Sequence, residues 1–130
     1  MERAASMRYI ARSYLNLHNE EEAEFWYKSA INEELNVREG YVELAMLYYN
    51  QGKWLDSICC LIKALRIKTK PMVYINEVFA WDGSIEDIMS LNYYYLGIYD
   101  LALYYVDKAL EYKNNDKRLL SNRDIFINLV

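Results

Sequence analysis

The sequence predicts a single all-α domain in which pairs of helices repeat and stack side by side. Turn-forming residues are scarce: the 130 residues include four glycines and one proline, whereas β-rich domains need many such residues. Hydrophobic residues make up 54% of the chain, enough for one core, and the length suits one compact domain. A third observation is an internal repeat of small and aromatic residues at constant spacing, which should be sought before local detail.

The repeat is clearest in the second and third of its three copies, which lie 45 residues apart, while the first copy precedes the second by 34 residues. The matched positions are Tyr14, Tyr48 and Tyr93; His18, Gly52 and Gly97; Ala23, Ser57 and Ala102; and Ala30, Ala64 and Ala109. Small side chains let helix backbones approach closely, while tyrosine and leucine fill the spaces between helices. The repeat therefore predicts three stacked helical hairpins.

The first hairpin is predicted at residues 4–17 and 20–35. Asn19 followed by Glu22 has the spacing of a capping box and should begin the second helix. His18 occupies the turn where the later copies have glycine. Glycine takes a left-handed conformation at low cost and histidine does not, so we expect this first turn to differ from the others.

The second hairpin is predicted at residues 38–50 and 54–68, and the third at residues 84–96 and 99–113. In both, a glycine follows the first helix and separates it from the second. With the first hairpin included, the predicted repeats span about 4–36, 38–69 and 84–114.

Eleven extra residues separate the second and third copies, because their spacing is 45 rather than 34 residues. The inserted stretch, residues 70–83, is too apolar for a flexible linker. Pro71 ends the preceding helix, and Asp82-Gly83 forms a turn. The residues expected to hold this insertion against the stack are Tyr74, Val78, Phe79 and Trp81. The alternative is that the aromatic loop, Trp81 above all, faces a ligand or partner.

A last helix is predicted at residues 117–128 and should cap the exposed end of the stack. The side chains expected to cover that end are Leu119, Leu120, Ile125, Phe126 and Leu129. Those expected to face water are Lys117, Arg118, Arg123 and Asp124. The alternative is that this helix offers a second binding surface.

These matched positions resemble the tetratricopeptide repeat (TPR), a helix–turn–helix unit, over about residues 4–113. The small and aromatic positions of the first helices are Ala11, Ala45 and Ser90, and Tyr14, Tyr48 and Tyr93. The proline that usually closes each unit is missing or displaced. The resemblance implies a right-handed superhelical stack of about three hairpins with a terminal capping helix, acting as a non-catalytic module that binds a protein, whether a peptide, a helix or a catalytic domain.

In TPR proteins the first helix of each pair lines a concave face. By register, the positions facing this groove are Arg8, Arg12 and Asn16; Val42, Met46, Tyr49 and Asn50; and Asp87, Leu91, Tyr94 and Tyr95. The groove is thus expected to be basic at one end and aromatic and apolar beyond. The alternative is that the insertion or a neighbouring domain covers part of it.

Some TPR proteins hold the C-terminal carboxylate of a peptide with a Lys/Asn clamp. Arg8 and Arg12 would imitate the first part of such a clamp. Glu43, Ser84 and Ile88 stand where its further polar or basic residues are needed. Binding of a chaperone tail is therefore not expected.

A longer pattern resembles the helical tail that follows the catalytic domain in some bacterial and phage family 2 glycosyltransferases. It includes Tyr9-Ile10-Ala11-Arg12-Ser13-Tyr14, residues 23–30, Pro71 to Trp81, Tyr94-Tyr95-Leu96-Gly97, Lys108 to Glu111, Asn115-Asp116-Lys117-Arg118 and Asn122-Arg123. The resemblance implies a C-terminal or accessory part of such an enzyme, docking a catalytic domain, acceptor protein or subunit. The sequence lacks the Asp-x-Asp motif and a Gly-rich phosphate loop, which places the transfer chemistry elsewhere. The alternative is a free-standing adaptor that binds a peptide or helix.

No catalytic, cofactor-binding or metal-binding residue is predicted, so the chain by itself is not expected to be an enzyme. His18 is the only histidine, and as a general base or metal ligand it would need an orienting carboxylate or further ligands. Glu20, Glu21 and Glu22 are near in sequence, but acidic residues at a helix start favourably meet its dipole, so His18 is interpreted as a turn residue. Cys59 and Cys60 are adjacent on a helix, where side chains point about 100° apart, which suits neither a shared metal nor a disulfide.

Charge and hydropathy exclude further classes of function. Lys and Arg number 15 against 19 Asp and Glu, a net charge of −4, which disfavours nucleic-acid binding. No apolar run reaches the roughly 18 residues of a membrane helix, and no signal peptide is visible. Two cysteines that cannot frame a disulfide scaffold favour the cytoplasm. The oligomeric state is left open.

Overall fold

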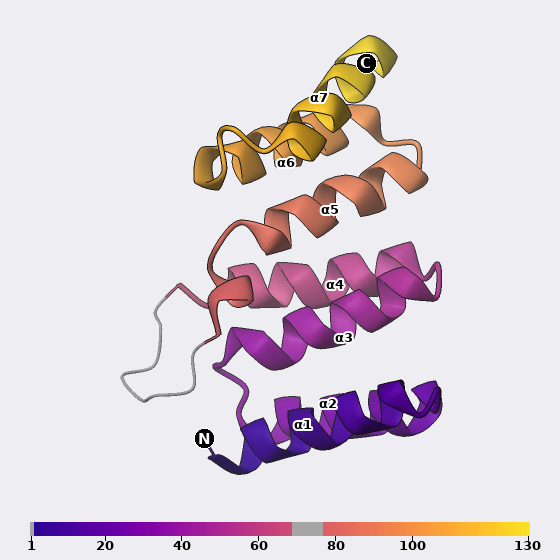
Figure 1. Cartoon of the computed structure of the whole chain (residues 1–130), viewed down its shortest axis with the longest axis vertical. Coiled ribbons are helices and arrows are strands. Elements are labelled where there is room, and N and C mark those ends of the chain that lie inside the picture. The colour runs from indigo at the N-terminus through magenta and orange to yellow at the C-terminus, as the bar shows by residue number, and fades with distance from the viewer. Residues whose placement is uncertain (1, 69–76) are drawn as a thin grey trace.

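The computed structural model describes residues 2–68 and 77–130, and these residues form seven α-helices, one short 3-10 helix and no strand (Figure 1). The helices are α1 Glu2–Asn16, α2 Glu20–Glu33, α3 Arg38–Asn50, α4 Trp54–Leu65, η1 Val78–Ala80, α5 Ser84–Tyr95, α6 Tyr99–Tyr112 and α7 Lys117–Leu129. The predicted fold class, an all-α stack of helical repeats, is confirmed.

The helices form antiparallel pairs that follow one another along the long axis of the molecule (Figure 1). Helix α1 packs on α2, α3 on α4, and α5 on α6, while α7 packs on α6. Contacts of α2 with α3 and of α4 with α5 join consecutive pairs. Each pair therefore buries its apolar face against its neighbours, as expected for stacked repeats.

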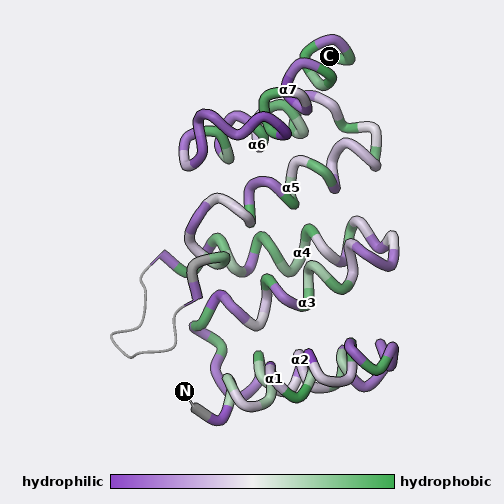
Figure 2. The backbone as a smooth tube through the Cα atoms, in the orientation of Figure 1, coloured by the Kyte–Doolittle hydropathy of each residue, from purple (hydrophilic) through white to green (hydrophobic). Residues whose placement is uncertain are grey.

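The matched small residues lie where helices meet. Ala11 and Ala23 are fully buried between α1 and α2, and Ala45 and Ala64 between α3 and α4. Larger side chains such as Leu61 fill the remaining space in the central cluster. Hydrophobic residues dominate α4 (Figure 2), the helix that packs on both α3 and α5. The core thus consists of successive buried clusters along the stack, in which small side chains let neighbouring helices lie close together.

A buried polar link joins the second and third repeats. Ser57, at a matched small position, donates its hydroxyl to the carbonyl of Ala45 at 2.8 Å. The same hydroxyl accepts a hydrogen bond from the side-chain amide of Asn92 at 2.9 Å. Ser57 and Asn92 are both fully buried, so this link fixes how α5 sits on α3 and α4.

The first inter-helix turn has the same conformation as the other two, so the expectation of a different turn was wrong. His18 has φ 59°, beside φ 74° at Gly52 and 76° at Gly97. In each turn the next amide bonds the carbonyl five residues earlier, at 2.8–2.9 Å: Asn19 to Tyr14, Lys53 to Tyr48, and Ile98 to Tyr93. The shared packing of each hairpin imposes the left-handed turn whichever residue occupies it.

Replacing His18 with glycine is expected to raise the free energy of unfolding by about 0.5–1 kcal/mol. Relief of the left-handed conformation exceeds the entropy that glycine adds to the unfolded chain. Gly97→Ala is the reverse control, because a Cβ there meets no atom within 4 Å, and it should cost about 1 kcal/mol. Urea unfolding measures both; a less stable His18→Gly variant contradicts this explanation.

The capping helix α7 buries only part of the expected apolar set. Leu119 and Phe126 are seven residues apart, share one helix face and are buried against α6. Leu120, Ile125 and Leu129 are exposed, contrary to the prediction. Leu120 and Ile125 project from other faces of the helix, and Leu129 is the last residue of α7. Of the four residues expected to face water, Lys117, Arg118 and Asp124 are exposed and Arg123 is half-buried. Arg118 and Arg123 also pair with Asp87 and Asp107.

The end of the insertion packs on the central core. Phe79 and Trp81 contact the cluster that contains Ile85 and Met89. The Arg38 guanidinium lies 3.8 Å from the Trp81 ring centroid and donates to the Ala80 carbonyl at 3.0 Å. These contacts support the packed reading of this part of the insertion over a partner-facing Trp81. Pro71, Tyr74 and the side chain of Val78 lie outside the described residues.

Candidate functional site: the groove of α1, α3 and α5

Helices α1, α3 and α5 and the residues around η1 line one hollow of about 560 Å³. The lining residues are Arg12, Glu43, Met46, Glu77, Phe79, Ser84, Asp87 and Ile88. A smaller hollow of about 190 Å³ adjoins it, sharing Glu43 and Met46 and reaching Glu20 and Asn50. Together the two hollows make a groove that runs from the first to the third repeat on the face formed by the first helices.

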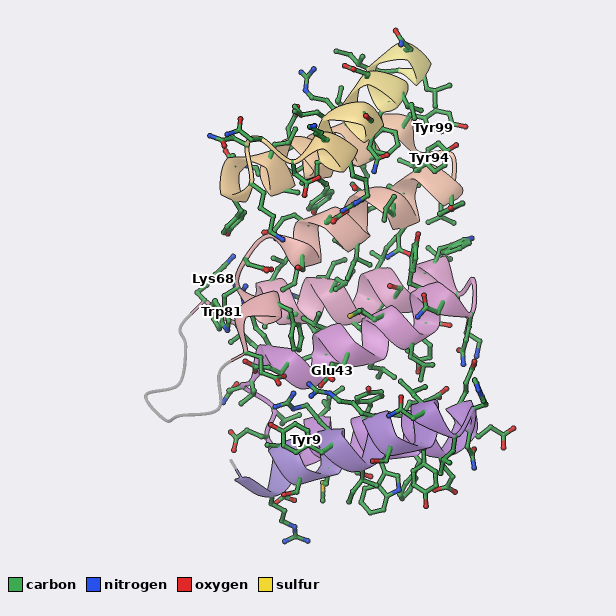
Figure 3. All side chains as sticks on the ribbon, in the orientation of Figure 1. Tyr9, Glu43, Lys68, Trp81, Tyr94 and Tyr99 are labelled. Atoms are coloured by element: carbon green, nitrogen blue, oxygen red, sulfur yellow. The ribbon has the colours of Figure 1, made fainter. Side chains whose placement is uncertain are left out.

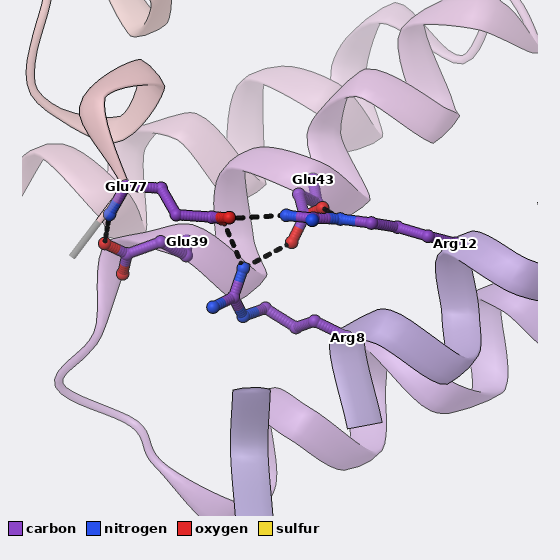
Figure 4. A network of polar contacts seen from close by, with 5 residues as sticks. All are labelled: Arg8, Arg12, Glu39, Glu43 and Glu77. Atoms are coloured by element: carbon purple, nitrogen blue, oxygen red, sulfur yellow. Dashed lines mark hydrogen bonds and ion pairs between the residues drawn. The ribbon is translucent and has the colours of Figure 1, made fainter. Parts of the chain in front are cut away.

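Two arginines and two glutamates form a network at one side of the groove (Figure 4). Arg8 Nη1 donates to Glu43 Oε2 at 2.8 Å and to Glu77 Oε2 at 2.7 Å. Arg12 Nη2 donates to the same Glu77 oxygen at 2.7 Å, and its Nε donates to Glu43 Oε1. The Glu77 amide donates to Glu39 Oε1 at 3.1 Å. The network joins α1, α3 and the residue that precedes η1.

Burial makes this network structural rather than a surface charge cluster. The Arg8 and Glu43 side chains are 3% and 8% exposed, so each charge needs the other. Figure 3 shows Glu43 between the ribbons of α1 and α3. Burial alone would raise the pKa of Glu77, but hydrogen bonds and positive charge from Arg8 and Arg12 prevail and lower that pKa. Glu77 is therefore held as a carboxylate, and both guanidiniums have carboxylate partners.

The groove was predicted to be basic at one end, and this prediction was wrong: both arginines there are paired with carboxylates. Arg8 is buried rather than exposed to a ligand. Arg12 lines the groove but carries two carboxylate partners. Neither guanidinium is left to hold the C-terminal carboxylate of a peptide.

Other predicted groove residues divide into exposed and buried ones. Val42 is fully buried in the central cluster, so its placement on the groove surface was wrong; its side chain points between α3 and its neighbours. Met46 is 45% exposed and lies where the two hollows meet. Asn50 lines the smaller hollow. Asn16 is exposed at the end of α1.

An aromatic cluster brings together Tyr49, Tyr94 and Tyr95 from the predicted set. Trp54 stacks on Tyr95 at 4.5 Å between ring centroids, and Tyr49 meets Trp54 edge-on at 5.4 Å. Tyr94 packs at 5.3 Å from Phe126 of α7. Burial raises the pKa of Tyr49, and Tyr95 raises it further. Tyr95 remains 53% exposed and offers contact area with a polar tip.

Asp87 and Leu91 complete the predicted positions. Leu91 is half-buried on α5. Asp87 lines the groove, and its Oδ2 pairs with Arg118 of α7. Its Oδ1 is buried and has no hydrogen-bond partner among the residues that the structure describes. Sequence reasoning missed Trp54, Glu77 and Arg118, because their contacts depend on how distant elements meet.

The cysteines lie on another face, beside a hollow of about 320 Å³ lined by α2, α3 and α4. Both are free thiols; Cys59 is exposed and Cys60 half-buried. Burial raises the pKa of Cys60 to about 11. Within residues 2–68 and 77–130, no three His, Cys, Asp or Glu side chains gather to hold a metal ion, and no helix is both long and apolar enough to cross a membrane.

At pH 8, iodoacetamide is expected to alkylate Cys59 well before Cys60. With a pKa of about 11, only about one Cys60 thiol in a thousand is ionised at that pH, and the thiolate is the nucleophile. Peptide mass spectrometry of the native protein over time measures the order. Equal rates in the folded protein contradict the burial of Cys60, and urea-unfolded protein, where both should react alike, is the control.

Comparison with known proteins gives fold matches. No family model matches the chain, and no curated protein matches its sequence. The N-terminal domain of stress-induced protein-1 (STI-1) from C. elegans superposes with a TM-score of 0.80 at 14% identity, over 96% of this chain and 94% of that one. YrrB, described as a TPR protein with an unusual peptide-binding site, gives 0.77 at 17% identity, over 93% of this chain and 57% of that one.

At these identities the matches show the fold alone: the chain is a stack of TPR-like helical hairpins. The TPR resemblance predicted from the matched positions is thereby confirmed. The resemblance to glycosyltransferase tails is not shown by these matches.

Proposed function

Starting from the TPR fold, we propose that this chain is a non-catalytic interaction module that binds a segment of another protein along α1, α3 and α5. The observation that carries the proposal is the groove itself: two adjoining hollows with the exposed thioether of Met46 at their junction. Exposed methionine on a concave face is typical of adaptable binding surfaces. The peptide-binding site of YrrB, on the same fold, adds support.

The predicted contact set is revised by burial. Arg8 and Val42 are buried inside the protein, and Trp81 is half-buried with its ring against the Arg38 guanidinium. The residues proposed to meet a partner are Arg12, Asn16, Met46, Tyr49, Asn50, Asp87, Leu91, Tyr94 and Tyr95.

The test is partner capture by the full chain and by two variants with the same chemical change. Met46→Arg places a long cation in the middle of the groove and is expected to abolish capture. Leu55→Arg is the matched control, because Leu55 is 65% exposed on α4 and lines neither hollow of the groove. Circular dichroism checks that both variants fold. Equal capture by wild type and Met46→Arg contradicts the groove proposal.

A finer proposal is that the partner is a family 2 glycosyltransferase, with this chain as its C-terminal or accessory part in the bacterial or phage cytoplasm. Its support is the run of sequence motifs from Tyr9-Ile10-Ala11-Arg12-Ser13-Tyr14 to Asn122-Arg123. The alternative is a free-standing adaptor for a peptide or helix. A glycosyltransferase region encoded directly upstream, or recovered in a capture that Met46→Arg abolishes, favours the first; recovery of unrelated proteins alone favours the adaptor.

A further inference from the structure

Building on the proposed function, we propose that the groove takes a cationic amphipathic segment and rejects acidic ones. Apolar side chains of that segment rest on Met46 and Ile88, and its lysine or arginine lies beside Asp87. The inference combines three features of the groove. Its floor is apolar, each guanidinium at its edge is paired with a carboxylate, and one carboxylate oxygen of Asp87 has no hydrogen-bond partner within the described residues.

The floor of the groove supplies apolar contact at its centre. Met46 is 45% exposed, and Phe79 and Ile88 line the same hollow. Met46 belongs to both hollows, so apolar surface continues from the third repeat toward the first. A bound segment therefore gains by presenting apolar side chains to α3 and α5.

The charges around this floor are unbalanced toward the negative. The Glu43 and Glu77 carboxylates are paired with Arg8 and Arg12, which leaves these four groups neutral as a set. The Glu39 carboxylate lies behind them, fully buried, and accepts from the Glu77 amide.

On the other side of the groove, Asp87 is paired with Arg118. Each of the three guanidiniums already contacts a carboxylate, so none is left for an acidic peptide or a terminal carboxylate. An anionic segment would have to displace Glu77 or Asp87, leaving a partly buried carboxylate without its cation.

Asp87 is the carboxylate at which we expect a bound cation to gain the most interaction energy. Its side chain is 20% exposed and shares one oxygen with Arg118. The second oxygen has no hydrogen-bond partner within the described residues, and an unsatisfied buried acceptor is costly. Arg118 is itself 53% exposed, so water weakens its hold on the carboxylate. A ligand ammonium or guanidinium at the groove edge would add to the weak positive field of Arg118 at this carboxylate, acting through its charge because Oδ1 is covered by protein atoms.

The adjoining smaller hollow also carries a negatively charged side chain. Glu20 lines it together with Glu43 and Met46, and the partner of Glu20 is the neutral amide of Gln51 at 2.6 Å. The net charge of −4 for the whole chain adds long-range attraction for a basic segment. The groove therefore presents apolar contacts with a carboxylate at each end, Asp87 beside Arg118 and Glu20 beside the Gln51 amide.

The test uses random 12-residue peptides displayed on phage and selected on the full chain. Selected sequences are then synthesised with amidated C-termini, and their affinities are measured by fluorescence anisotropy. We expect enrichment of lysine and arginine interspersed with apolar residues, and loss of binding to Met46→Arg. Asp87→Asn should weaken binding about fivefold, and Arg118→Gln should tighten it by a similar factor.

Asp124→Asn is the matched control, because Asp124 is exposed on α7 and lines neither hollow of the groove. It removes the same charge as Asp87→Asn and should leave affinity unchanged. Equal weakening by the two variants shows general attraction to an acidic protein and overturns the inference.

Two further outcomes separate this inference from the proposed function. Selection of acidic peptides, or of peptides that need a free C-terminal carboxylate, overturns the cationic inference while the groove still binds, provided that Met46→Arg abolishes binding. Selected peptides that bind wild type and Met46→Arg equally overturn both.

Discussion

Replacing Glu43 with alanine is expected to lower the free energy of unfolding by about 3 kcal/mol. The change removes the carboxylate that accepts from both Arg8 and Arg12 and is only 8% exposed. Arg8 keeps Glu77 as its one partner, which is not enough for a buried guanidinium. Urea denaturation followed by circular dichroism measures the loss.

A paired substitution serves as the control for this prediction. Arg8→Met together with Glu43→Leu removes both buried charges and leaves the Arg12–Glu77 pair at 2.7 Å intact. Replacing a buried ion pair with apolar residues of similar size is often neutral, so the double variant should recover most of the lost stability. If Glu43→Ala alone stays within about 0.5 kcal/mol of wild type, an amount usual for surface changes, the network is not a structural tie.

Replacing Leu61 with alanine is expected to destabilise the fold by about 3 kcal/mol. Leu61 is fully buried in the central cluster, beside Ala45, Ala64 and Met89. Its removal leaves a cavity at the level where the second and third repeats meet, and close-packed helices relax only partly around such a space. Thermal and urea unfolding both report the change.

Leu55 is the control for Leu61, because it lies on the same helix and is 65% exposed. Leu55→Ala should change stability by less than about 0.5 kcal/mol. Similar losses for the two leucines would mean that α4 does not bury the face on which Leu61 lies.

Helix positions and stacking followed from the sequence because small residues recur at a fixed spacing. Ala23 and Ala102 occupy one matched position and Ala64 another, and all three are fully buried where helices meet. Only close helix contact requires a small side chain at such a position, so the pattern carries information on packing. The fold class was therefore predictable without any knowledge of long-range contacts.

The chemistry of the groove was less predictable. Helical register indicates which face of a helix a residue occupies, but it does not indicate which distant residue that side chain contacts. Register placed Arg8 on the groove face, but its carboxylates come from Glu43 and from Glu77, 69 residues away in sequence. Val42 lies at the edge of the same register and turns into the core. The left-handed His18 shows the same limit of local rules, because the packing of the hairpin overrides the preference of the residue.

The most direct test of the central claim is to map where a bound segment lies on the folded protein. Methyl and amide NMR shifts of the full chain, titrated with a peptide from the phage selection, provide that map. Binding in the groove predicts the largest shifts at the Met46 methyl and at amides of α3 and α5 around Asp87. Shifts confined to α2, α4 and α6, with Met46 unchanged, would contradict it.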